Sequence, residues 1–348
     1  MLIINNKRKN ERYNMNIKKI GLTALAASLV SVSAHAGALT ASGSASMNME
    51  GHSGEGLNAG STFSMANSVT LAGSGELDNG LTVSVSFELD QGNANGSQSA
   101  SQTTSDGAVF DNHSVSVSSD TLGTLTLAGH GGNSATTAID TTAAGDMWDN
   151  FDQLSSALTS FPDAFKAQGG VNDNLFYKSP DLTDGLNVTA SYDPQAGTSG
   201  PESETGYGIN YTGFEGLSLS YATTEVSGTA NTEGDNDVIK ASYAYGPVTV
   251  SYSNSEEDTV AAASDGETTS YAISYTLSDE LSITYGSEEH SRGGTADVAD
   301  AEIDGISVAY TTGGMTISAA MQDGENLDFT NDSDADVEYW SIGASFAF

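Results

Sequence analysis

The acidic residues of this chain are the ones best suited to bind metal cations. One run of them has the spacing of calcium ligands. Asp332, Asp334 and Asp336 alternate as the first ligands of a calcium loop do. The glycine required after the third acid is Val337, and the closing glutamate position holds Gly343. These residues therefore exclude a helix–loop–helix calcium site, while loose binding of Ca²⁺ or Mg²⁺ by acidic loops stays open.

Nucleophilic catalysis finds no support in the sequence. A hydrolase needs a nucleophile, a base and a group that orients the base. The histidines after residue 36 are isolated, and neither Gly-x-Ser-x-Gly nor His-Glu-x-x-His occurs. The adjacent pair His52-Ser53 is interpreted as a chance neighbour in a loop. We therefore predict that the protein is not an enzyme and has no catalytic residues.

Residues 1–36 have the pattern of an export signal. Lys18 and Lys19 precede an apolar run over 20–32, which is short for a membrane span. The small residues Ala34 and Ala36 flank His35 as a cleavage site would. We predict cleavage after Ala36, with Met15 as the expected start; the alternative is an N-terminal membrane anchor.

Charge separates the remaining chain from nucleic-acid binders. Without residues 1–36 it keeps four basic residues against 45 acidic ones, a formal net charge of −41. The basic residues are Lys166, Lys178, Lys240 and Arg292. So few cations could not neutralise a row of phosphates, and small cations are the favoured mobile partners. The chain has no cysteine, so this exported protein is expected to do without disulfides.

Apolar and hydroxyl side chains alternate from about residue 38 to the end. A period of two places successive side chains on opposite faces of a strand. With no helices to cover the apolar face, the strands are expected to close into a barrel with that face in lipid. Sixteen segments are predicted, at 38–50, 61–77, 81–90, 110–118, 123–130, 172–179, 186–192, 205–212, 217–225, 237–245, 248–254, 269–276, 281–288, 302–311, 315–322 and 337–348.

The connections between these segments alternate in length. Tight ones such as 78–80, 246–247 and 312–314 carry the Gly, Asn or Asp of hairpin turns. Long polar connections lie between them, and those at 91–109, 226–236, 255–268, 289–301 and 323–336 hold most of the acids. Short turns on one rim and long loops on the other are typical of outer-membrane barrels. The connection over 131–171 is the longest.

The alternation also separates a lipid face from a lumen. In the segments at 248–254, 269–276 and 281–288, one parity is apolar and ends in Tyr, which suits the headgroup level. The opposite parity is Ser, Thr or Ala, which predicts a hydrated interior, since sixteen strands enclose more space than side chains fill.

Aromatic residues are missing from the first part of the predicted wall. All thirteen Tyr after residue 36 lie at or beyond Tyr177, and residues 37–130 contain only three Phe. The outward positions of the first segment are Leu39, Ala41, Gly43, Ala45, Met47 and Met49. Such small or flexible side chains allow close approach of another subunit. We therefore expect the first five segments to form the interface of a homo-oligomer, the alternative being an Ala-rich lipid face.

The last segment carries a family resemblance. Trp340, Ile342, Ala344 and Phe346 alternate up to the C-terminal Phe348. This pattern resembles the terminal signature of Gram-negative general porins, which the outer-membrane assembly machinery reads. The segments 75–81 and 122–127 are also similar to porin hairpins. Trp340, Phe346 and Phe348 are accordingly the expected assembly signal.

The resemblance implies a homotrimer of sixteen-stranded barrels whose third long loop folds inward to narrow each pore. The longest connection, 131–171, has the matching position. Its acids would face the aperture, and its aromatic residues, including Trp148 and Phe151, would hold it against the wall. The predicted constriction residues are Asp140, Asp146, Asp149, Asp152 and Asp163. The alternative is an exposed acidic loop.

The chain departs from the family in its basic residues. General porins set a cluster of Arg and Lys opposite the loop acids. Here the inward parity offers only Lys178, Lys240 and His130, which are scattered. A cation-preferring aperture is therefore expected.

Together these observations predict an outer-membrane general diffusion porin for small hydrophilic solutes and ions. One alternative is a solute-specific channel, for which Trp148 and Phe151 could begin an aromatic track. A second alternative is a secreted, calcium-binding surface β-protein.

Overall fold

The fold is known over most of the chain. The computed structural model describes residues 39–54, 60–91, 110–139, 142–151, 172–194, 203–227, 233–259, 265–293, 299–329 and 336–348. The predicted export signal, residues 1–36, lies outside the described residues. None of the helices in these ranges is long and apolar enough to cross a membrane.

Sixteen strands account for nearly all the regular structure. They are β1 (Thr40–Ser53), β2 (Gly60–Glu76), β3 (Thr82–Gln91), β4 (His113–Ser119), β5 (Gly123–His130), β6 (Asn174–Lys178), β7 (Leu186–Asp193), β8 (Ser203–Tyr211), β9 (Leu217–Ser227), β10 (Gly234–Tyr245), β11 (Val248–Thr259), β12 (Gly266–Ser278), β13 (Leu281–Arg292), β14 (Ala301–Thr312), β15 (Met315–Glu325) and β16 (Val337–Ala347). All sixteen predicted segments are confirmed.

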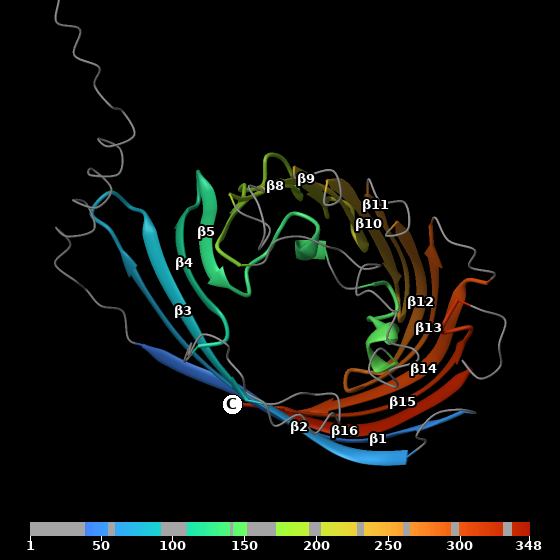
Figure 1. The fold of residues 1–348 in the computed structure, drawn as a ribbon. Coiled ribbons are helices and arrows are strands. Elements are labelled where there is room, and N and C mark those ends of the chain that lie inside the picture. The colour runs from blue at the N-terminus through green and yellow to red at the C-terminus, as the bar shows by residue number, and fades with distance from the viewer. Residues whose placement is uncertain are drawn as a thin grey trace, which may run out of the picture.

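The strands form one closed antiparallel barrel. Each strand pairs with its neighbours in sequence, and β1 pairs with β16, so the sheet has no free edge. The seam is completed where Gly43 and Phe348 exchange backbone hydrogen bonds of 2.9 and 3.0 Å. Figure 1 shows the resulting ring of strands.

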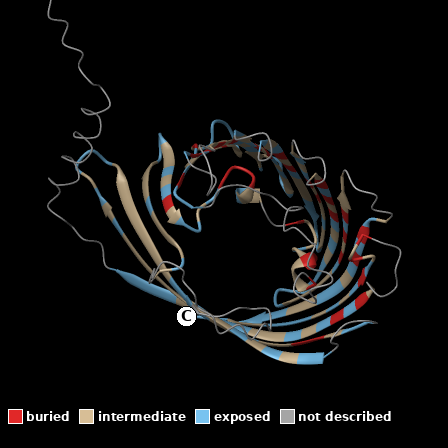
Figure 2. Ribbon diagram, viewed as in Figure 1, coloured by how far each residue is buried: buried red, intermediate tan, exposed pale blue. Residues whose placement is uncertain are grey.

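Alternation decides which side chains face outward. Tyr252 of β11 lies opposite Tyr271 of β12, and both belong to the predicted lipid-facing parity. The outward set is exposed and apolar, as Ile273 and Tyr285 illustrate. Buried residues instead gather along β7–β16 and on the chain segment inside the ring (Figure 2). The burial pattern therefore matches a barrel that is apolar on its outside.

The strands at the long-loop rim extend further than predicted. β11 runs to Thr259 and β13 to Arg292, where the sequence pattern predicted ends at 254 and 288. Several acids assigned to loops therefore lie in strands. The reason is that backbone pairing continues into water, where both parities are polar and the apolar alternation that marks a strand is lost.

Outward acids form a belt beside the tyrosines at this rim. The Tyr221 hydroxyl donates to Asp237 Oδ1 (2.7 Å), and the Tyr285 hydroxyl donates to Asp304 Oδ1 (2.9 Å). Asp237 lies opposite Glu256, which in turn lies opposite Glu267. Tyrosine rings thus mark the level at which the outer face changes from apolar to acidic.

Candidate functional site

The connection between β5 and β6 spans 131–173 and includes the long predicted loop. Residues 131–139 and 142–151 of this connection are called the inner segment. The segment holds two 3₁₀-helices, η1 (Thr137–Ile139) and η2 (Met147–Asn150). In Figure 1 it is the green chain that lies inside the ring of strands.

Hydroxyl groups of the wall hold the first half of the inner segment. The N–H of Ala135 donates to Ser191 Oγ of β7 (2.9 Å). The hydroxyls of Thr136 and Thr224 of β9 are 2.9 Å apart and share a hydrogen bond. All four residues are buried. Small inward-facing hydroxyls therefore take the place of a packed core at this part of the wall.

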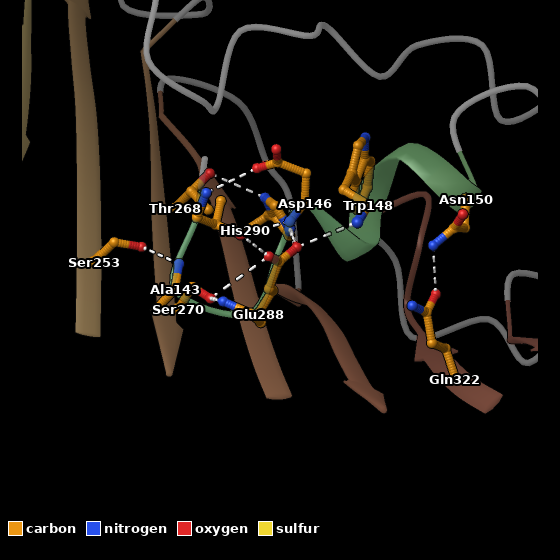
Figure 3. Close-up of polar contacts among 12 residues, drawn as sticks. Ala143, Asp146, Trp148, Asn150, Ser253, Thr268, Ser270, Glu288, His290 and Gln322 are labelled. Atoms are coloured by element: carbon orange, nitrogen blue, oxygen red, sulfur yellow. Dashed lines mark hydrogen bonds and ion pairs between the residues drawn. The ribbon is translucent and has the colours of Figure 1, made fainter. Parts of the chain in front are cut away.

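The same device holds the middle of the inner segment. The N–H of Ala143 donates to Ser253 Oγ of β11 (2.8 Å), and the N–H of Ala144 donates to Ser270 Oγ of β12 (2.9 Å). Both serines have the parity that the sequence assigned to the lumen. Consecutive backbone N–H groups thus pair with hydroxyls on adjacent strands, which fixes the direction of the segment along the wall (Figure 3).

Glu288 of β13 has partners both in the inner segment and on the wall. Its side chain is 1 % exposed, and its oxygens accept hydrogen bonds from the Thr142 hydroxyl and from the N–H of Trp148 (3.2 Å). The Ser270 hydroxyl approaches the same carboxylate at 3.5 Å. A buried carboxylate requires such donors. Glu288 thereby ties both ends of the turn before η2 to the wall (Figure 3).

His290 belongs to the same network, although it looked isolated in sequence. Its Nδ1 shares a hydrogen bond with the Thr268 hydroxyl (3.0 Å), and its Nε2 is 3.6 Å from Glu288 Oε2. Its ring centroid is 4.4 Å from that of Trp148. The sequence carried one signal that was missed: Glu288 and His290 share the inward parity of one strand.

Glycines in the wall make room for the inner segment. Gly286 of β13 lies opposite Gly305 of β14, and both face inward. A Cβ atom at Gly286 would lie 2.7 Å from the Cβ of Ala144, and one at Gly305 would lie 3.1 Å from Met147 Sδ. Larger side chains at either position would displace the segment, because a strand glycine here allows a close approach.

A small apolar core forms where η2 meets β14–β16 and β1. Trp148 is 7 % exposed and Phe151 is 2 % exposed. The Phe151 ring lies 6.1 Å from that of Tyr339 and 6.3 Å from that of His52. His52 Nε2 also lies 2.8 Å from the Asn150 carbonyl oxygen. The core comprises Met147, Trp148, Phe151, Ala301, Ile303, Leu327, Phe329, Val337 and Tyr339.

Two of the five predicted constriction acids lie in the inner segment. Asp146 Oδ1 accepts the Thr142 N–H (2.9 Å), and the Asp146 N–H donates to the Thr142 hydroxyl (2.8 Å). Asp146 therefore closes the turn before η2, with a positive φ of 54°. Asp149 lies in the first turn of η2. The other three, Asp140, Asp152 and Asp163, lie outside the described residues.

The predicted basic residues lie at three different levels of the wall. Lys240 lies opposite Ser253, at the level of the inner segment. Lys178 ends β6 at the short-turn rim, opposite Thr124. His130 ends β5 six residues further along, about 20 Å away at ~3.3 Å per residue. Its Nδ1 lies 3.9 Å from Asp111. The structure thus brings none of the three together.

The described part of the chain contains no preformed metal-binding site. No group of three or more His, Asp or Glu residues in these ranges could hold a metal ion. Asp336 Oδ1 accepts the N–H of Asn326 (3.1 Å), and Asp332 and Asp334 lie outside the described residues.

From Trp340 onward, the large apolar residues of the terminal strand face outward. Trp340, Phe346 and Phe348 share the outward parity of β16 and are exposed, with Phe348 73 % exposed. The residues expected to act as an assembly signal therefore lie on the outer surface, beside the seam with β1.

Comparisons with known proteins give one family. A family model for Gram-negative porins matches residues 21–348. Solved structures with this fold include an anion-selective porin from Comamonas acidovorans (TM-score 0.63, 14 % identity, 89 % of this chain and 99 % of that one). Another is Salmonella typhi OmpF in complex with daunomycin (TM-score 0.65, 15 % identity, 89 % of this chain and 97 % of that one). A third is Vibrio cholerae OmpT (TM-score 0.58, 14 % identity, 89 % of this chain and 97 % of that one). No curated protein sequence matches the chain.

Proposed function

The chain belongs to the Gram-negative porin family, and we propose that it is a general, cation-preferring diffusion channel of the outer membrane. The family match covers nearly the whole chain, and the closed sixteen-strand barrel agrees with it. Small hydrophilic solutes and ions would cross the membrane through the lumen, down their gradients. The exposed apolar outer face argues against the secreted surface protein considered as an alternative.

The lumen supports passive diffusion. Its inward-facing positions are mainly Ser, Thr and Ala on β1–β5, as the register of β2 with β3 illustrates. Part of that wall borders a cavity of about 300 Å³ lined by residues such as Thr40, Ser84 and Ser116. Short hydroxyl side chains leave water-filled space between this wall and the inner segment. We propose that this space, beside the inner segment, is the narrowest part of the channel.

A solute-specific channel is the second candidate, and the burial of its key residues disfavours it. Trp148 and Phe151 could have begun an aromatic track along the lumen. Both are buried in the core that holds η2, so neither offers a ring face to a passing solute. General diffusion therefore has the better support.

The single observation that carries the cation preference is the missing basic cluster. Among the described residues, Lys178, Lys240 and Arg292 are the inward-facing Lys and Arg, and they lie on different strands at different levels. Inward-facing carboxylates in the same part of the chain include Glu50 and Glu288. The relative from Comamonas acidovorans is described as anion-selective, so selectivity must be tested for each chain.

The outer face of β1–β5 supports assembly into a homotrimer. Its exposed large residues include Met47, Phe63, Met65 and Leu127, and it contains no Tyr or Trp. The outward tyrosines lie on β6–β14 instead. A wall without interfacial Tyr or Trp suits contact with another subunit better than contact with headgroups. Export by residues 1–36 and insertion through the terminal Phe348 complete the proposal.

Liposome swelling with neutral sugars of increasing size tests the proposal. A general diffusion channel gives rates that fall smoothly with solute size and do not saturate with concentration. Saturation by one solute, with exclusion of others of similar size, would favour the solute-specific alternative. Chemical cross-linking of the detergent-solubilised protein tests the oligomer, since a monomeric product would remove the homotrimer.

A further inference from the structure

A turn at the outer end of β15 also folds into the barrel. We propose that Asn326–Phe329 is a second inward element that clamps η2, with Leu327 and Phe329 as the positioning residues that keep the inner segment docked. The proposal rests on the proposed channel function, because it concerns the segment that narrows the channel. The turn belongs to the last long connection, 323–336, for which the sequence pattern predicted only an acidic loop.

Local hydrogen bonds fix the path of this turn. The Phe329 N–H donates to the Asn326 carbonyl (2.7 Å), and the Asn326 N–H donates to Asp336 Oδ1 (3.1 Å) at the start of β16. Asn326 and Phe329 both have positive φ, 52° and 59°. A bulky residue rarely adopts this conformation, so the surrounding contacts must hold Phe329 in it.

Leu327 enters the barrel over a wall glycine. A Cβ atom at Gly324 of β15 would lie 3.0 Å from both methyl groups of Leu327. The side chain at Leu327 is 1 % exposed. Gly324 thus continues the recess that Gly286 and Gly305 begin for the inner segment. Because Gly324 has no side chain, the Leu327 side chain can pack directly against the backbone of β15.

Phe329 lies between the inner segment and the wall. The ring centroids of Phe329 and Trp148 are 6.3 Å apart. The guanidinium carbon of Arg292 lies 4.8 Å from the centroid of the Phe329 ring. The side chain at Phe329 is 1 % exposed. One ring therefore contacts η2 and the outer end of β13 together, at the distance of a cation–π contact.

The arrangement gives the inner segment two kinds of support. Glu288 and the serine hydroxyls hold it against the wall, while Leu327 and Phe329 cover η2 from the side of the outer loops. Without these two side chains, water would reach Met147 and Trp148, and η2 would lose the apolar contacts that oppose its release into the lumen.

A cysteine reporter measures this protection directly. The chain has no cysteine, so Met147→Cys introduces a single thiol at a position that is 4 % exposed. The folded protein is treated in detergent micelles with a charged, water-soluble methanethiosulfonate reagent, and its labelling rate is followed by mass spectrometry. The rate is compared with and without the added pair Leu327→Ala and Phe329→Ala. Single-channel records of each variant are taken in parallel.

The proposal predicts labelling at least about tenfold faster in the L327A/F329A background, together with unsteady conductance. The matched control, Leu182→Ala with Phe214→Ala, makes the same changes at exposed positions and is expected to leave the rate within twofold. Heat-dependent gel mobility reports whether each barrel is folded. If the double variant does not fold, Phe329→Leu keeps an apolar side chain and is expected to speed labelling at least threefold.

The outcomes separate this proposal from the proposed function. Equal labelling rates in folded L327A/F329A or F329L and in their parent would overturn the clamp, whether or not the protein conducts. Faster labelling in a protein that forms no channels would uphold the clamp and remove the diffusion function.

Discussion

Replacement of Glu288 by Gln removes a buried negative charge with almost no change in side-chain volume. The carboxylate accepts hydrogen bonds from the Thr142 hydroxyl and the Trp148 N–H, and it is 1 % exposed. Glutamine keeps one acceptor oxygen and turns an N–H₂ group toward the other donor. The substitution therefore acts on the contacts that dock the inner segment and leaves the strand pairing of the wall intact.

Hydrogen bonds set the size of the expected effect. A bond to a charged group contributes about 1.5–3 kcal/mol, and a buried donor without an acceptor costs about 1–3 kcal/mol. Allowing for relaxation, the E288Q substitution should weaken docking of the inner segment by about 2–4 kcal/mol. Since about 1.4 kcal/mol corresponds to tenfold in an equilibrium constant, the undocked population rises about 30- to 700-fold.

Single-channel recording in a planar bilayer measures this change. The E288Q channel is expected to switch among several conductance levels, whereas the parent holds one. Glu289→Gln is the matched control, because the next residue of β13 faces outward and is exposed. Records of E288Q that match those of E289Q in level and noise would refute the role assigned to Glu288.

Three other perturbations test the glycine recess, the outward acids and the terminal Phe348. Gly286→Val should displace Ala144 at a cost of about 1–3 kcal/mol and give unsteady conductance. The control Ala319→Val, at an exposed outward position of β15, should not, and equal effects would contradict the recess. Raising salt from about 0.01 M to about 1 M shortens the Debye length from about 30 Å to about 3 Å. The melting temperature should then rise, because the repulsion among the outward acids around Glu256 is screened. The rise should be larger when Ca²⁺ or Mg²⁺ supplies the ionic strength. An unchanged melting temperature would contradict the repulsion assigned to these acids. Phe348→Ala, which keeps the backbone hydrogen bonds with Gly43, should reduce the folded protein recovered from outer membranes but not refolding into detergent, and normal recovery would remove the assembly signal.

The strand count and order could be predicted because the lipid imposes a strict period of two. Leu281, Ile283 and Tyr285 alternate with small polar residues, and the structure gives them the outward parity that the pattern indicates. The ends of strands such as β11 could not be predicted, since Glu256 and Asp258 lie beyond the lipid, where neither face has to be apolar.

The position of the inner segment was predictable only in outline. The length of the connection and its aromatic residues indicated a loop packed against the wall, and Trp148 and Phe151 do pack there. Its partners on the wall depend on the stagger between strands, which brings Ser253, Ser270 and Glu288 to one level from positions far apart in sequence. A single sequence does not contain that stagger, so the shared inward parity of Glu288 and His290 was not enough to assign them to the site in advance.

The reversal potential of the refolded protein in a planar bilayer under a salt gradient tests the central claim most directly. With potassium chloride more concentrated on one side, an acid-dominated aperture should give stepwise conductance and a reversal potential of the sign set by potassium. A reversal potential of the chloride sign would contradict the cation preference. A folded protein that gives no conductance steps would contradict the diffusion channel itself.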